Sequence, residues 1–285
     1  MRRLKIKHTT TYHYSESVAF LPHRLILRPR EGPDVRLETS ILEITPAHQI
    51  RWQRDVYNNS VGIISFLEPA TQLSIYSEVL IQSYEDAPLD FIVSEYAVHF
   101  PFRYRSEEQV DLMPYQLPVF PKDSDAIAQW VAYFWKPGWV LETYVLLDQL
   151  NKAISQGLNY AMREAPGVQT PAKTLNTQSG SCRDFATLFI EACRYLGLAA
   201  RFVSGYQHGP ATETGPGVTH AWAEIYLPGA GWKGFDPTHG EVVGNQHIAV
   251  AVHRDPEAVP PVSGAFSGQL SQPPELKVEV RVSAS

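Results

Sequence analysis

The hydrophobic pattern of the chain changes its period near residue 117, and this change constrains the fold more than any other feature. Before it, apolar and polar residues alternate in short runs, which is the pattern of β-strands with one buried face. Turn-forming residues such as Asn58 and Asn59 separate the runs, and strands spaced in this way predict a β-sandwich. The runs are Arg2 to Tyr14, Val18 to Leu27, Val35 to Ile44, Ile50 to Val56, Val61 to Leu67 and Leu73 to Tyr84.

After the change, apolar residues recur at spacings of three and four, which predicts helices. The helical runs are Ala126 to Phe134, Val140 to Leu158 and Cys182 to Leu196, and strands are predicted at Ala199 to Tyr206 and Leu276 to Val282. Pro114, Pro118 and Pro121 mark the boundary, because proline donates no hydrogen bond to a β-ladder. We therefore expect an α+β chain with an N-terminal domain at residues 1–117, a core at 118–254, and a Pro-containing connection with a final strand at 255–285.

Composition and charge exclude several classes of protein. With 44% hydrophobic residues and a formal net charge of −6, the chain should fold as a globule that nucleic acid and anionic membranes do not attract. No apolar run approaches the roughly 18 residues of a membrane helix, and residues 1–10 lack the apolar core of a signal peptide. Two cysteines cannot form a disulfide framework. We expect a cytoplasmic protein in a reducing compartment.

The segment Ser181-Cys182-Arg183-Asp184 predicts that Cys182 lies in the first turn of a helix. Ser181 can cap the helix, and the side chain of Asp184 at the third helical position can accept a hydrogen bond from the Ser181 backbone N–H. The helix dipole and the unpaired N–H groups favour a thiolate at Cys182. On this segment alone, a small buried structural cysteine is an equally open interpretation. Cys193 lies 11 residues further on, roughly 16 Å along the same helix, so it is predicted to pack in the core and cannot pair with Cys182.

A hairpin is predicted at residues 218–236, with its turn at Pro228 to Gly231. In a register symmetric about Pro228, His220 lies directly opposite Asp236, within reach of a hydrogen bond. A register centred one residue later sets His220 against Thr238 and Asp236 opposite Trp222. Both registers keep a base and an orienting carboxylate close together, although a structural cross-strand pair is the plainer alternative.

Three blocks together resemble the motifs of the transglutaminase-like superfamily: Gly180-Ser-Cys-Arg-Asp-Phe185, Thr219-His-Ala-Trp-Ala-Glu224 and Gly231-Trp-Lys-Gly-Phe-Asp-Pro-Thr238. The resemblance covers residues 125–238, and the preceding β-rich segment resembles the N-terminal domain of the bacterial members, which are often described as cysteine proteases. It implies a papain-like core with Cys182 as nucleophile, His220 as general base and acid, and Asp236 as orienter.

The sequence departs from the animal cross-linking enzymes of this superfamily. Their Gly-Gln-Cys-Trp motif is absent, because Ser181 and Arg183 flank the cysteine, and no acidic cluster resembles a calcium loop. Calcium activation is therefore not expected. His208 and His239 lie near the hairpin in sequence, but no metal-binding motif includes them, so we expect surface or supporting histidines, no metal and no cofactor.

Other residues are candidates for the oxyanion hole, the substrate groove and a flap over the site. By analogy, the backbone N–H of Cys182 is one oxyanion donor, and the second is Gln178, Tyr160 or one of Trp130, Trp135 and Trp139. Trp222, Trp232 and Tyr206 are candidates to line a substrate groove, although such aromatics more often belong to the core. The Gly- and Pro-rich loop from Gln207 to Gly217 is either a flap over the site or an ordinary connection.

Together these residues predict a cysteine hydrolase. A thiolate would attack an amide carbonyl of a peptide or protein substrate, and water would release the acyl group. An amine acceptor would instead make the enzyme a transglutaminase. A binding module without catalysis is the alternative from a different class, but it has no need of a Cys–His–Asp arrangement.

Overall fold

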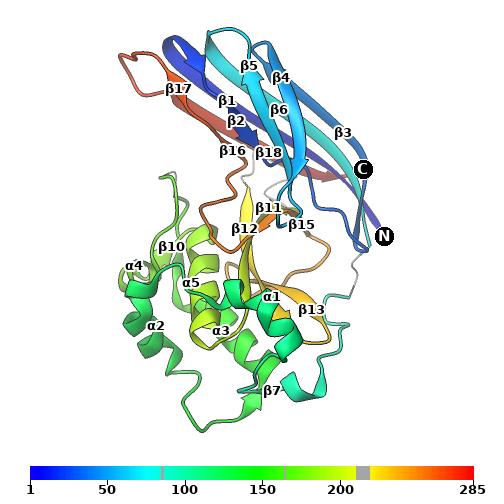
Figure 1. Cartoon of the computed structure of the whole chain (residues 1–285), viewed down its shortest axis with the longest axis vertical. Helices are drawn as coiled ribbons and strands as arrows, with labels where there is room; N and C mark the ends of the chain where they lie inside the picture. Colours follow the sequence, from blue (N-terminus) through cyan, green and yellow to red (C-terminus); the bar gives the residue numbers. More distant parts are fainter. Residues whose placement is uncertain (85–86, 164, 210–218) are drawn as a thin grey trace.

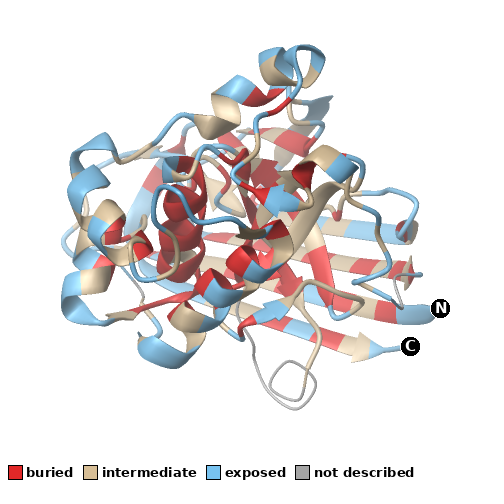
Figure 2. Cartoon of the chain, turned by 90° about the horizontal axis from the view of Figure 1, so that it is seen from below, coloured by how far each residue is buried: buried red, intermediate tan, exposed pale blue. Residues whose placement is uncertain are grey.

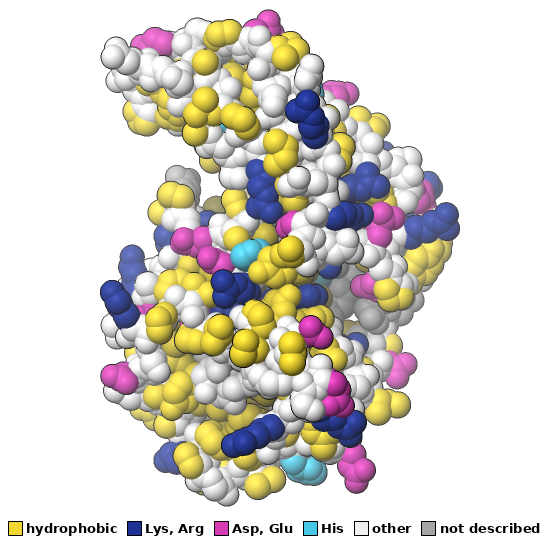
Figure 3. Space-filling view, viewed as in Figure 1, with side chains coloured by type: hydrophobic (Ala, Val, Ile, Leu, Met, Phe, Trp, Pro, Cys, Tyr) yellow, Lys and Arg dark blue, Asp and Glu magenta, His cyan; other side chains and the backbone are white. Residues whose placement is uncertain are grey.

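The computed structural model describes residues 1–84, 87–163, 165–209 and 219–285. It has an elongated β-rich part at one end and a mixed helical and β part at the other (Figure 1). The surface is indented where the two parts meet, and basic and acidic side chains are interspersed over the face in Figure 3. No helix among the described residues is long and apolar enough to cross a membrane.

The β-rich part contains two sheets, as the alternating sequence pattern predicts. One sheet has the order β17-β1-β6-β3, with β18 also paired to β1, and the other has the order β16-β2-β5-β4. Buried side chains of both sheets, including Val18, Leu25 and Leu73, form a single apolar cluster. The strands are β1 (Arg2–Phe20), β2 (His23–Leu25), β3 (Val35–Thr45), β4 (His48–Arg54), β5 (Ser60–Phe66), β6 (Ala70–Ser83), β16 (Val262–Ser263), β17 (Phe266–Ser267) and β18 (Glu275–Ala284).

The end of the chain returns to the N-terminal sheets. β18 runs antiparallel to β1 from the pair Leu4–Ala284 to the pair His13–Glu275. β17 also pairs with β1, and β16 pairs with β2. The segment expected as a connection with one final strand therefore contributes three strands to the two sheets of the β-rich part.

The second part is built on an antiparallel sheet with the order β14-β13-β12-β11-β15. Its strands are β11 (Ala200–Gln207), β12 (His220–Leu227), β13 (Gly231–Asp236), β14 (Glu241–Val242) and β15 (His247–His253). The helices are α1 (Ser106–Gln116), α2 (Ser124–Val131), α3 (Thr143–Gly157), α4 (Pro171–Thr177) and α5 (Cys182–Tyr195). Short strand pairs join β7 (His99–Phe100) to β8 (Leu141–Glu142) and β9 (Asn159–Tyr160) to β10 (Ser179–Gly180).

Helix α5 is the centre of this part. It packs against β11 and β12 and contacts α2, α3 and α4, and all but two of its residues are buried. Figure 2 shows a helix coloured red along most of its length among helices with blue outer faces. A helix that is covered on every side is fixed in position, so its first residue, Cys182, is fixed with it.

The proline-rich stretch differs from the expected linker. Pro114 lies inside α1, where it removes one backbone hydrogen bond close to the C-terminal end of the helix. Helix α1 contacts α5 and β11. It therefore packs with the second part of the molecule, whereas the expected boundary at residue 118 assigns it to the first.

Candidate active site

Cys182 is held at the start of α5 by a buried carboxylate. Asp184 accepts hydrogen bonds from the backbone N and the Oγ of Ser181, at 2.8 and 2.9 Å. Ser181 has extended backbone angles, so the chain enters the helix at Cys182, as the Ser-x-x-Asp pattern predicts. The Cys182 side chain is itself buried, at 7% exposure, and its backbone N–H belongs to the first turn, where helices leave such groups without an internal partner.

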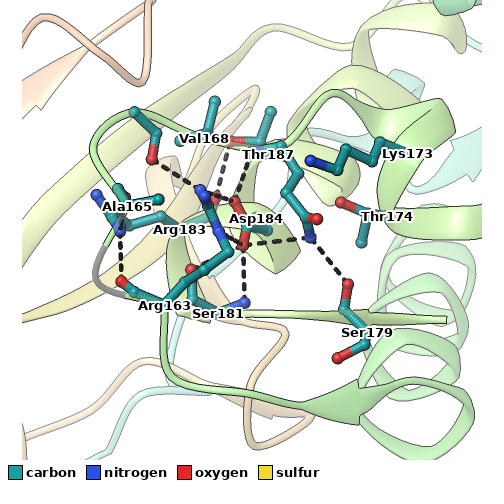
Figure 4. A network of polar contacts seen from close by, with 12 residues as sticks. Arg163, Ala165, Val168, Lys173, Thr174, Ser179, Ser181, Arg183, Asp184 and Thr187 are labelled. Atoms are coloured by element: carbon teal, nitrogen blue, oxygen red, sulfur yellow. Dashed lines mark hydrogen bonds and ion pairs between the residues drawn. The ribbon is translucent and has the colours of Figure 1, made fainter. Parts of the chain in front are cut away.

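A polar network extends from Asp184 to the preceding loop (Figure 4). Arg163 donates from Nε at 3.0 Å and from Nη2 at 3.2 Å, and the backbone N of Gln169 donates at 2.6 Å. Arg183 donates in turn to the carbonyl oxygens of Arg163 and Ala165. Burial alone would raise the pKa of Asp184, but the hydrogen bonds from Arg163, Gln169 and Ser181 outweigh it and lower the pKa. The network ties the loop before the cysteine to the helix.

His220 lies between Cys182 and Asp236. Its Nε2 is 2.7 Å from Oδ2 of Asp236, and its side chain also forms a hydrogen bond with Cys182. Burial acts to lower the pKa of His220, but the bonds to Asp236 and Cys182 raise it to about 10. These contacts favour the protonated imidazole.

The hairpin register that brings His220 and Asp236 together is the second of the two considered from the sequence. Ala223 pairs with Phe235 and Leu227 with Gly231, so the centre lies one residue later than Pro228. The symmetric register, which set His220 directly opposite Asp236, is therefore wrong. The two residues are diagonal neighbours on one face, and long side chains can bridge that separation.

Asp236 has two further histidine partners that the sequence did not identify as such. Nδ1 of His239 and Nε2 of His247 lie 2.9 and 3.0 Å from the same Oδ2 atom. The other carboxylate oxygen accepts from the backbone N of Thr238. Burial alone would raise the pKa of Asp236, yet the three imidazole contacts lower it well below its usual range. His239 follows Asp236 closely enough in sequence to be suspected, whereas His247 comes from β15 and no local signal reveals it.

The two oxyanion candidates are both exposed, but they lie in different local structures. β9 pairs in parallel with β10, which places Tyr160 beside Gly180, two residues before the cysteine. Burial and the nearby charges of Cys182 and Asp236 raise the pKa of Tyr160, so its hydroxyl stays protonated. Gln178 is exposed and ends α4 in a left-handed conformation with φ of 50°.

The tryptophans considered as alternative donors have structural contacts. The ring of Trp130 packs on that of Phe134, with 5.0 Å between centroids. Nε1 of Trp135 donates to the carbonyl oxygen of Trp139. Trp139 itself is half exposed.

Tyr206 does not line a groove, because the structure buries it. It is 2% exposed, and its hydroxyl bonds to Nδ1 of His8 on β1 at 2.9 Å. Trp222 is 1% exposed and packs with Val203 and Val252. Tyr206 and Trp222 therefore belong to the core, and Trp222 also borders a cavity.

That cavity has a volume of about 380 Å³ and lies between the β-rich part and the face of the core sheet. Trp222 and Trp232 border it, as do His247, Arg30 and Arg201. Arg201 lies over the ring of Trp232 at 4.1 Å and pairs with Glu224 at 2.6 Å. Cys182 is not among the lining residues of this cavity. The position of Trp222 and Trp232 on its wall therefore does not place them in a substrate groove beside the cysteine.

Cys193 lies in the core, as the sequence predicts. Cys193 is fully buried on the apolar side of α5, and burial raises its pKa. Both cysteines are free thiols. The loop considered as a flap, Gln207 to Gly217, falls mostly on residues 210–218, which lie outside the described residues.

Two family models match the chain. The bacterial transglutaminase-like N-terminal region matches residues 4–82. The transglutaminase-like superfamily matches residues 139–237, a range that contains Cys182, His220 and Asp236. The first match covers strands of the two N-terminal sheets, and the second covers α5 and the hairpin.

The chain is also similar to individual proteins. A protein of Mycobacterium tuberculosis, uncharacterised itself, is 30% identical over 284 residues, which are 92% of this chain and 87% of the relative. The crystal structure of a candidate cysteine protease from Cytophaga hutchinsonii has a TM-score of 0.74 over 99% of this chain and 90% of that one, and its 19% identity limits the likeness to the fold. A protein-glutamine gamma-glutamyltransferase of Pseudomonas aeruginosa is 36% identical over 70 residues, 22% of this chain and 10% of that protein.

Proposed function

The chain belongs to the transglutaminase-like superfamily, and we propose that it is a cysteine-dependent acyl-transfer enzyme that hydrolyses peptide or amide bonds. One observation carries the proposal: His220 contacts both Cys182 and Asp236. A nucleophilic cysteine needs an adjacent base, and the base needs an orienting group. In this proposal Cys182 is the nucleophile, His220 the base and Asp236 the orienting group, and hydrogen bonds link the three side chains.

In the proposed reaction, the Cys182 thiolate attacks the carbonyl carbon of the scissile amide. The C–S bond forms first and the carbonyl oxygen becomes an oxyanion. The C–N bond breaks when this intermediate collapses, and the imidazolium of His220 gives its proton to the leaving amine. Neutral His220 then removes a proton from water, and the resulting hydroxide equivalent attacks the thioester. The acid product leaves, and Cys182 and His220 return to the ion pair.

We assign Asp236 to hold the imidazole ring of His220. It accepts from Nε2, which leaves the other ring nitrogen for Cys182 and for the leaving group. An ionised carboxylate also stabilises the imidazolium that forms in the cycle. The three imidazole contacts lower the pKa of Asp236 well below its usual range, which favours the ionised carboxylate.

The backbone N–H of Cys182 and the hydroxyl of Tyr160 are the proposed oxyanion donors. The first points out of a helix N-terminus, where negative charge is favoured. The second belongs to a residue close enough for the charge of Cys182 to raise its pKa. Gln178 is a weaker candidate, because its left-handed position serves to end α4.

Hydrolysis rather than transamidation is proposed because water is the acceptor in excess unless a site excludes it. The test is to incubate the protein with a library of fluorogenic peptides, with and without a primary amine such as cadaverine, and to identify the products by mass spectrometry. We expect free acids, and we expect Cys182→Ala to abolish them while Cys193→Ala does not. Amine adducts as the main product would assign a transglutaminase instead, and turnover that persists in Cys182→Ala would contradict the proposal.

A further inference from the structure

Three imidazoles converge on one carboxylate oxygen, although the proposed reaction uses only one of them. His220 Nε2, His239 Nδ1 and His247 Nε2 lie 2.7, 2.9 and 3.0 Å from Oδ2 of Asp236. One carboxylate oxygen offers about two lone pairs, so it cannot accept three well-directed hydrogen bonds at once. The cluster therefore holds more nitrogen donors than a single orienting carboxylate needs.

We propose that His220, Asp236 and His247 form a binding site for a divalent transition-metal ion of the Zn²⁺ type. Their ligand atoms all lie within 4.8 Å of one another. Zn²⁺ binds imidazole nitrogen and carboxylate oxygen at about 2.0–2.2 Å and accepts two histidines and one carboxylate with an open fourth position. Two imidazoles and a single carboxylate oxygen suit Zn²⁺ or Co²⁺ far better than Ca²⁺ or Mg²⁺, which prefer oxygen ligands.

The two nitrogen–oxygen separations are close to those that a tetrahedral ion requires. Ligand atoms on a tetrahedral ion are about 3.3 Å apart when the bonds are about 2.0 Å long. The two nitrogen–oxygen separations in the cluster are 2.7 and 3.0 Å. The rings must move outward by a few tenths of an ångström, and the ion replaces the protons that His220 and His247 share with Asp236.

Access and the second nitrogen of His247 also fit this assignment. Asp236 and His247 are almost fully covered, but the side chain of His239 on the same oxygen is 46% exposed, so its rotation opens a route from solvent. Nδ1 of His247 has no hydrogen-bond partner among the described residues. His247 borders the cavity of about 380 Å³, which has room for water to accept the proton that a metal-bound imidazole carries on its other nitrogen.

A regulatory consequence follows, and it rests on the proposed function. With an ion on Nε2, His220 loses its hydrogen bond to Asp236 and can no longer pass easily between its protonated and neutral forms. The acyl transfer should therefore stop while the ion is bound and resume when it is removed. The site is an inhibitory one, since the ion occupies groups that the reaction requires.

Titration with Co²⁺ tests the site without any substrate. We expect intense visible absorption typical of four-coordinate Co²⁺ that saturates at one equivalent and lacks a thiolate-to-cobalt charge-transfer band. The absorption should persist in Cys182→Ser, while His247→Ala should weaken Co²⁺ binding at least tenfold. The matched control is His253→Ala, a histidine of the same strand outside the cluster, which should bind as the native protein does.

Two outcomes would overturn the proposal: a charge-transfer band that vanishes in Cys182→Ser, or unchanged affinity in a folded His247→Ala variant. The charge-transfer test can be made even if His247→Ala does not fold, because it needs only the native protein and Cys182→Ser. Once a cleaved peptide is found, Zn²⁺ should reduce turnover at least tenfold and EDTA should restore it. Co²⁺ binding by a protein without any turnover would remove the proposed function and leave the metal site standing.

Discussion

The buried carboxylate of Asp236 favours the protonated form of the histidine next to it. It is fully covered, and the imidazoles of His220, His239 and His247 all contact its Oδ2 atom. The pKa of His220 is raised to about 10 by Asp236 and Cys182, against the cost of burial. The native protein therefore holds a proton on His220 that the unfolded chain loses near pH 6.5.

This difference predicts how stability depends on pH. A group whose pKa is raised on folding stabilises fully below its unfolded pKa and loses that contribution as pH rises through the folded pKa. Below about pH 8.5 the unfolded chain carries a proton on the Cys182 thiol that the proposed native thiolate lacks, and this offsets the extra proton on His220. The free energy of unfolding should thus fall between about pH 8.5 and about pH 10 more steeply in the native protein than in His220→Asn. Urea unfolding of both proteins across this pH range measures the free energy of unfolding. If its dependence on pH is the same in both proteins, His220 holds no extra proton in the native state.

The sequence could predict the three residues of the proposed triad, but not the exact hairpin register or the additional histidine His247. The three motif blocks identify Cys182, His220 and Asp236 because the residue types and spacing are distinctive. The hairpin register was open by one residue, since Pro228 and its neighbours allow two centres, and the structure uses the later one. His247 was missed because β15 joins the sheet beside β11, a pairing between strands 40 residues apart that no local pattern encodes.

At the scale of elements, the buried N-terminus of α5 depends on Asp184. The Ser-x-x-Asp pattern predicted the cap, but Arg163 and Gln169 come from a polar loop whose path the sequence leaves open. Asp184→Ala would leave the guanidinium of Arg163 and two backbone N–H groups without their partner. Leaving a buried donor without its partner typically costs about 1–3 kcal/mol, so we expect a loss of at least that order in urea unfolding, together with slower alkylation of Cys182.

Asp148→Ala is the matched control for this loss. Asp148 forms an ion pair with Lys152 on α3, and both side chains reach solvent. Exposed pairs contribute little, so the control should unfold close to the native protein. Equal losses in the two variants would show that the Asp184 network does not specifically stabilise α5.

At the scale of the whole molecule, the β-rich part and the core share one apolar interior. Leu4 and Ile6 of β1 belong to the same buried cluster as Phe185 and Phe189 of α5. A buried hydrogen bond crosses the boundary as well, from His8 on β1 to Tyr206 on β11. Period-two patterns predicted the strands, including the last one, but which strand β18 would join depends on distant pairing with β1.

Tyr206→Phe tests whether this contact couples the two parts. Burial lowers the pKa of His8 to about 4, so the ring is neutral, and loss of the hydroxyl leaves its Nδ1 buried without a partner. Such a loss costs about 1–3 kcal/mol, which thermal unfolding can measure. Tyr133→Phe, at a residue 82% exposed, should leave the melting temperature unchanged. An unaltered melting temperature in Tyr206→Phe would argue that the two parts do not depend on this contact.

We propose that His220 keeps Cys182 as a thiolate, and the pH dependence of iodoacetamide labelling is the measurement that tests this pairing. Mass spectrometry follows Cys182 and the buried Cys193 separately, in the native protein and in His220→Ala. We predict rapid labelling of Cys182 well below the pH of about 8.5 at which an ordinary thiol ionises, loss of that reactivity in His220→Ala, and no labelling of Cys193 while the protein is folded. Labelling of Cys182 that rises only near pH 8.5, and equally in both proteins, would contradict the account.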